Sequence, residues 1–234
     1  MVKDTIILSA DTSSLKFSIA LLKGVKLIAQ YFSKGPNRQS SDMLPEIGRL
    51  LSENSHKIED IGLFSIGIGP GSFTGLRIGI TAMRAMAFAL RRPVIGIPSI
   101  DAIAYAVTSE EADTCVIIDA KQEKLYVRFY RKRGPAIKPI GKIELLSIER
   151  LLARIKRPVL FAGDGIAIYK DVILKAKLPR VNFAAYDKWF PKASAIGKLS
   201  FDKLKQGHRD SVLTLSPLYI YPKECSIRKQ RKKL

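Results

Sequence analysis

The sequence is poor in the residues that most often bind metals or carry redox chemistry. It contains two cysteines, Cys115 and Cys225, and two histidines, His56 and His208, in 234 residues. The cysteines form neither a metal-binding spacing nor a disulfide framework, which favours a reducing compartment. Neither histidine has an Asp, Glu or Cys at ligand spacing, so we predict no metal site in this chain.

Long apolar segments are also missing. No run approaches the roughly 20 apolar residues that a membrane-spanning helix needs. The first residues lead into a strand-like run without the pattern of a signal peptide. We therefore expect no membrane association and a cytoplasmic location.

Acidic residues are few: 21 Asp and Glu stand against 40 Lys and Arg, a net charge of +19. Charge informs about partners rather than fold. A polyanion such as RNA is one interpretation, and a generally basic proteome is the other. The basic residues are most concentrated at the C-terminal end, where we expect a flexible tail over residues 222–234.

Two parts of the chain repeat one order of predicted elements. Asp11 opens the turn of one strand–turn–strand hairpin, and Asp119 opens the turn of a second. Alternating helices and strands follow each hairpin. The predicted strands cover 5–10, 16–22, 25–32, 61–68, 94–97, 114–118, 124–131 and 159–162. The predicted helices cover 41–53, 73–90, 100–107, 147–155, 166–175 and 194–206.

This repeat favours an internal duplication, although Asp is common in turns and chance is the alternative. A duplicated α/β layout with paired hairpin aspartates is similar to that of the actin/hexokinase/Hsp70-like (ASKHA) superfamily, which has two ribonuclease-H-like lobes with mixed sheets. We predict an N-terminal lobe over 1–100, rejoined by the helix near 194–206, and a smaller lobe over 101–193.

In that superfamily both turns approach the phosphates of ATP. The resemblance makes a small set of residues candidates for a vestigial nucleotide site: Asp11, Ser13, Asp119, Gly163 and Gly165. No Ser/His/Asp set and no catalytic base can be identified, so we predict no catalytic residues. An active ATP-dependent phosphotransferase or ATPase remains the alternative.

The segment from Gly69 to Arg77 lacks the Gly-Lys-Ser/Thr ending of a Walker motif, which favours a plain strand-to-helix turn. The helix after it carries a stripe of small residues that begins with Gly75 and Gly79 and continues with alanines. Because glycine inside a helix costs about 1 kcal/mol relative to alanine, close packing of another element must offset it. That element belongs either to the same lobe or to a partner.

Helix 41–53 has its own apolar face at helical spacing. With the small-residue helix it makes our candidate partner interface, which comprises Leu44, Ile47, Leu51, Gly75, Leu76, Gly79, Met83 and Met86.

The strand over 124–131 places basic and aromatic residues on one face, because side chains alternate along a strand. Lys124, Tyr126, Arg128 and Tyr130 are therefore candidates for contact with RNA. A solvated strand face is the other interpretation.

Two longer stretches carry a family resemblance. Residues 7–13 read Ile-Leu-Ser-Ala-Asp-Thr-Ser, and residues 66–79 read Ile-Gly-Ile-Gly-Pro-Gly-Ser-Phe-Thr-Gly-Leu-Arg-Ile-Gly. Both resemble the TsaB (YeaZ) family. The likeness continues at residues 96–100, 118–120, 163–165 and 217–219 and so covers nearly the whole chain.

The resemblance implies a non-catalytic subunit that pairs with TsaD in the N6-threonylcarbamoylation of the adenosine next to the anticodon in tRNA. It implies TsaE as a further partner, tRNA contact through the complex, and homodimers through the same helices. No cofactor is implied for this chain, while ATP and a metal ion are implied for the partner subunits. Gln39-Ser40-Ser41 stands where the family often has His-Ser-Glu.

Overall fold

The computed structural model describes residues 4–33, 35, 39–107, 112–133 and 136–220. The chain divides into two compact units. The first unit comprises residues up to 107 together with 185–218, and the second comprises 108–184 and the residues after 218. The sequence-based division placed these boundaries at 100 and 193. The predicted basic tail, residues 222–234, lies outside the described residues.

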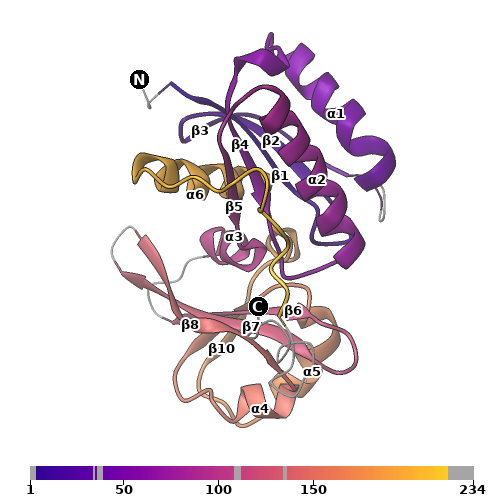
Figure 1. The fold of residues 1–234 in the computed structure, drawn as a ribbon. Helices are drawn as coiled ribbons and strands as arrows, with labels where there is room; N and C mark the ends of the chain where they lie inside the picture. The colour runs from indigo at the N-terminus through magenta and orange to yellow at the C-terminus, as the bar shows by residue number, and fades with distance from the viewer. Residues whose placement is uncertain (1–3, 34, 36–38, 108–111, 134–135, 221–234) are drawn as a thin grey trace, which may run out of the picture. The chain divides into compact units, whose positions relative to one another are not determined.

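The first unit is built on a five-stranded mixed sheet (Figure 1). The strands lie in the order β3-β2-β1-β4-β5. Strands β1, β2 and β3 form an antiparallel meander, while β4 and β5 continue the sheet parallel to β1. Their bounds are β1 Ile6–Asp11, β2 Ser18–Lys23, β3 Lys26–Phe32, β4 Ile61–Gly67 and β5 Val94–Ile97.

Helices cover both faces of this sheet. Alternate residues of β1 point to opposite faces. Leu8 packs into a core with residues of α1 (Gln39–Glu53) and α2 (Phe73–Ala89), as Met43 and Met83 illustrate. Ile7 packs into a second core with α6 (Ala193–Lys205) and α3 (Ser99–Tyr105). The short helix η1 (Ile58–Asp60) precedes β4.

The second unit repeats this topology. Its sheet has the order β10-β9-β6-β7-β8, with an antiparallel meander and two parallel strands as in the first unit. The strands are β6 Asp113–Asp119, β7 Leu125–Arg133, β8 Ala136–Leu146, β9 Val159–Ala162 and β10 Val181–Phe183. The helices are α4 Ile148–Leu152 and α5 Ile166–Lys175. The matching topology agrees with the duplication predicted from the two aspartate turns, although β8 and β10 were not predicted.

The segment after α6 closes the open edge of β5. The backbone N–H of Asp210 donates to Val94 O at 3.0 Å, and its carboxylate accepts the N–H of Gly96 at 2.8 Å. The guanidinium of Arg84, on α2, donates to three carbonyl oxygens, those of Val212, Leu213 and Leu215. We call residues 207–218 the strap. Through Arg84 it is fixed to α2 as well as to the sheet.

None of the helices in the described part of the chain combines the length and apolar character needed to cross a membrane.

Candidate interface and the two aspartate turns

The turn after β1 holds Asp11 in a fully internal network. Asp11 is 1% exposed. One carboxylate oxygen accepts the backbone N–H and the hydroxyl of Ser13, at 2.9 and 2.7 Å. The other accepts the hydroxyl of Ser99 at 2.6 Å, and the Ser99 oxygen in turn accepts the N–H of Gly69 at 3.0 Å. The carboxylate thus ties the first turn to the start of α3 and to the loop after β4.

Burial shifts the pKa of this carboxyl group. Loss of solvent raises the pKa of Asp11 above its ordinary value, and the hydrogen bonds from Ser99 and Ser13 oppose that rise in part. Both oxygens already have donors within the unit. Asp11 and Ser13, two candidates for a vestigial nucleotide site, organise this turn, and their contact with a nucleotide stays a prediction. Ser99 is the functional partner that the sequence reasoning missed, because its role depends on the pairing of β4 with β5.

The helix that carries the small residues, α2, packs closely against the same turn. The N–H of Ser72, the residue before α2, donates to Ser13 O at 2.7 Å. A Cβ at Gly75 would overlap the carbonyl oxygen of Thr12, and one at Gly79 would overlap the Thr12 hydroxyl. Thr12 is fully buried, and its hydroxyl has no hydrogen-bond partner among the described residues. The two glycines are therefore explained by packing inside the unit.

The second turn is more open. The Asp119 side chain is 14% exposed and pairs with the Nζ of Lys121 at 2.6 Å. The backbone N–H of Asp119 donates to the carboxylate of Asp164 at 3.0 Å, and burial raises the pKa of Asp164. Gly163 has φ +102°, and a Cβ there would overlap Ile117 O. A role of Asp119, Gly163 and Gly165 in nucleotide binding stays a prediction.

The predicted helical interface needs correction. Six of its eight residues are buried in the first unit's own core: Ile47, Leu51, Gly75, Leu76, Gly79 and Met83. Met86 is half-buried and packs against the same core. Leu44 alone among the eight is exposed, at 58%. Helical periodicity identified residues that share a face, but that face turns inward because α1 and α2 must cover their own sheet.

The outward face of α1 and α2 has a different composition. On α2 it combines small and apolar residues with an arginine, and on α1 it contains Leu44 and Gly48. A Cβ at Gly48 would meet nothing within 4 Å. The guanidinium of Arg77 lies 3.9 Å from the Phe73 ring centroid. We call this surface the outer helical face, and its exposed or half-exposed residues are Leu44, Gly48, Phe73, Thr74, Arg77, Ile78, Thr81, Ala85 and Phe88.

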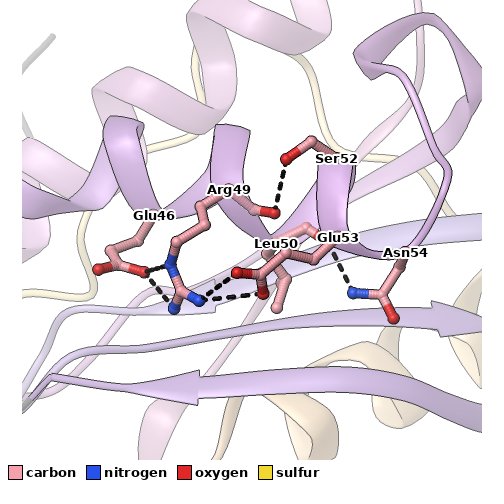
Figure 2. A network of polar contacts seen from close by, with 6 residues as sticks. All are labelled: Glu46, Arg49, Leu50, Ser52, Glu53 and Asn54. Atoms are coloured by element: carbon pink, nitrogen blue, oxygen red, sulfur yellow. Dashed lines mark hydrogen bonds and ion pairs between the residues drawn. The ribbon is translucent and has the colours of Figure 1, made fainter.

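A polar network borders this face on α1. Figure 2 shows Arg49 between Glu46 and Glu53, with N–O distances of 2.6 to 3.0 Å. The Arg49 guanidinium also lies 5.7 Å from the ring centroid of Tyr31 on β3. The network therefore occupies the β3 side of α1.

The predicted RNA-contacting strand is also corrected. Tyr130 is 1% exposed. Its pairing partner on β6, Thr114, is 2% exposed, so this part of the face is covered rather than solvated. The Nε of Arg128 donates to Gly141 O at 3.2 Å, and burial raises the pKa of the half-buried Tyr126. Lys124, at the start of the strand, is half-exposed. The prediction that these four residues form an RNA surface is therefore wrong at Tyr130, which is buried.

Over the residues that the structure describes, no group of three or more His, Cys, Asp or Glu side chains is placed to hold a metal ion.

Comparison with known proteins gives consistent results. The family model described as "TsaD: tRNA N6-adenosine threonylcarbamoyltransferase" matches residues 37–225. A Bacillus subtilis protein named "tRNA threonylcarbamoyladenosine biosynthesis protein TsaB" is 28% identical over 170 residues, which cover 71% of this chain and 74% of the relative.

Solved structures support the fold. "YeaZ from Pseudomonas aeruginosa" superposes with a TM-score of 0.78 at 24% identity, over 92% of this chain and all of that one. The activator of the 2-hydroxyisocaproyl-CoA dehydratase from Clostridium difficile, solved with bound ADPNP, gives 0.50 at 11% identity, over 92% of this chain and all of that one. With the duplicated topology, these likenesses confirm the predicted fold class.

Proposed function

Because the chain belongs to the TsaB (YeaZ) family of tRNA threonylcarbamoyladenosine biosynthesis proteins, we propose that it is a non-catalytic subunit that pairs with TsaD. In this proposal TsaD carries out the N6-threonylcarbamoylation of the adenosine next to the anticodon. TsaE joins as an ATPase, and tRNA is contacted through the complex in the cytoplasm.

The composition of the outer helical face is the main support for pairing with TsaD. Thr74, Ile78, Thr81 and Ala85 follow one another at helical spacing on α2, and each is exposed or half-exposed. Short side chains allow another helix to approach closely, so that its side chains pack against backbone. Phe73 and Phe88, which are 53% and 65% exposed, flank this stripe and offer apolar area to a partner.

The state of Asp11 supports the non-catalytic part of the proposal. A carboxylate that holds Mg-ATP through water must present an oxygen to that water. At Asp11 both oxygens already accept hydrogen bonds from Ser13 and Ser99, and the side chain is 1% exposed. A contact between Asp11 and Mg-ATP through water would first require this buried side chain to become accessible to that water.

A matched pair of variants tests the pairing. Ala85→Arg places a long side chain on the outer helical face, while Ala167→Arg changes another exposed alanine, on α5 of the second unit. Co-expression with TsaD from the same organism should recover a complex with wild type and Ala167→Arg and none with Ala85→Arg. If Ala85→Arg pairs normally, the outer helical face is not the interface. If wild type fails to pair, the partnership itself is wrong.

Calorimetry with Mg-ATP on the isolated chain tests the alternative of an active ATPase. The non-catalytic subunit predicts no binding at micromolar concentrations. Micromolar binding that is lost on Asp11→Ala would favour an enzyme. The same preparations, run by analytical ultracentrifugation, show whether the isolated chain forms a homodimer that Ala85→Arg dissociates.

A further inference from the structure

An aromatic cluster stands on the segment that leads into α6. Tyr186 begins the short helix η2 (Tyr186–Lys188) and is 59% exposed. Its ring centroid lies 5.1 Å from that of Trp189, at 65°, and 5.7 Å from that of Phe190, at 84°. These edge-to-face contacts fix the orientation of the tyrosine ring, while much of the residue remains exposed to solvent. We call these three residues the aromatic platform.

The platform is fixed to the first unit. The N–H of Trp189 donates to Tyr186 O at 3.1 Å, which closes the helical turn. Just beyond it, the buried hydroxyl of Ser18 on β2 donates to Pro191 O at 3.2 Å and accepts the N–H of Ala193 at 3.0 Å. A ring that is already held in place loses little conformational entropy when a flat ligand stacks on it.

The charge around the platform is positive. Lys188 is exposed and ends the same short helix that Tyr186 begins. Asp187, the acidic residue of η2, pairs with the Nζ of Lys192 at 3.4 Å, so the segment keeps a net positive charge. The whole chain carries +19. Aromatic faces next to lysines suit a nucleobase and its phosphate, whereas an apolar protein partner gains nothing from the adjacent cations.

We propose that the aromatic platform binds an unpaired base of RNA, which stacks on Tyr186 while Lys188 contacts the adjoining phosphate. The proposal rests on the proposed function in that the RNA is a loop of the tRNA being modified. The aromatic platform takes the place of the candidate RNA surface on β7, of which Tyr130 is buried. The platform shares no residue with the outer helical face.

Trp189 gives a direct readout, because it is the one tryptophan in the sequence. Titration of the isolated chain with a single-stranded oligouridylate of eight nucleotides should quench its fluorescence saturably. Tyr186→Ala should weaken binding about 5- to 150-fold, the range expected for the loss of one stacking contact. Tyr186→Phe, which keeps the ring, should bind nearly as wild type, and so should Tyr105→Ala, a matched control 38% exposed on α3.

Two further results decide the assignment. Lys188→Gln should lower the slope of log affinity against log salt by about 0.7, the value for one phosphate on a single strand. The proposal is overturned if the oligonucleotide causes no quenching, if Tyr186→Ala binds like wild type, or if TsaD quenches Trp189 while RNA does not. Because the titration needs no partner, its failure leaves the Ala85→Arg test of the pairing intact.

Discussion

The contact between α2 and the first turn makes a quantitative prediction for Gly79→Ala. Elsewhere in a helix this change stabilises by up to about 1 kcal/mol, because alanine has the higher helix propensity. Here the new methyl would overlap the Thr12 hydroxyl and lie 2.9 Å from its Cγ2. Thr12 is fully buried, so it cannot move aside without shifting the turn. Overpacking of this kind costs about 1–3 kcal/mol, which exceeds the gain in helix propensity, and we expect a net loss of up to about 2 kcal/mol.

Urea denaturation followed by circular dichroism measures this change, and two further variants isolate its cause. Gly48→Ala on α1 has open space around its Cβ and should be neutral or stabilising by up to about 1 kcal/mol. Thr12→Ala removes the overlapping atoms and a buried hydroxyl that has no partner within the described residues. In that background Gly79→Ala should cost less than half of what it costs in the wild type. Equal losses in both backgrounds, or a stable Gly79→Ala single variant, would refute the packing account.

Two more predictions concern the strap and the first turn. Arg84→Met removes a guanidinium that binds three strap carbonyls, so the unfolding free energy should fall by about 1.5–3 kcal/mol, and amide exchange at Asp210 and Leu218 should accelerate. No change in their exchange would show that Arg84 does not hold the strap. Burial raises the pKa of Asp11 in the folded chain, so its contribution to stability is present at low pH and is lost as pH rises through the folded-state pKa. Asp11→Asn should therefore flatten the decline of unfolding free energy with pH, and an unchanged pH profile would contradict this.

Much of the fold follows from local patterns. The bounds of β5, β9 and α5 agree with those expected from apolar runs and flanking turn residues. Strand β8 was not predicted, and it contains Pro139 and Gly141, the latter at φ +74°, which are residues that disfavour a regular strand. It forms because β7 offers it a pairing edge, which is a tertiary effect that a local pattern does not contain.

The functional surfaces were harder to predict from the sequence, for a related reason. The stripe on α2 was correctly read as a place of close approach, but the sequence left open whether the neighbour was internal. In the structure Gly75 and Gly79 meet the first turn, while Ala85 and Ala89 are exposed. Alternation along β7 identified one face, but not that the sheet buries Tyr130 there.

Reconstituted tRNA modification tests the central claim most directly. TsaD, TsaE, threonylcarbamoyl-adenylate, ATP and unmodified tRNA are combined with and without this chain, and threonylcarbamoyladenosine is quantified by mass spectrometry. The account predicts modification when the chain and TsaD are both present, with wild type and Ala167→Arg active and Ala85→Arg inactive. Equal modification by TsaD and TsaE without the chain, or modification by the chain without TsaD, would contradict it.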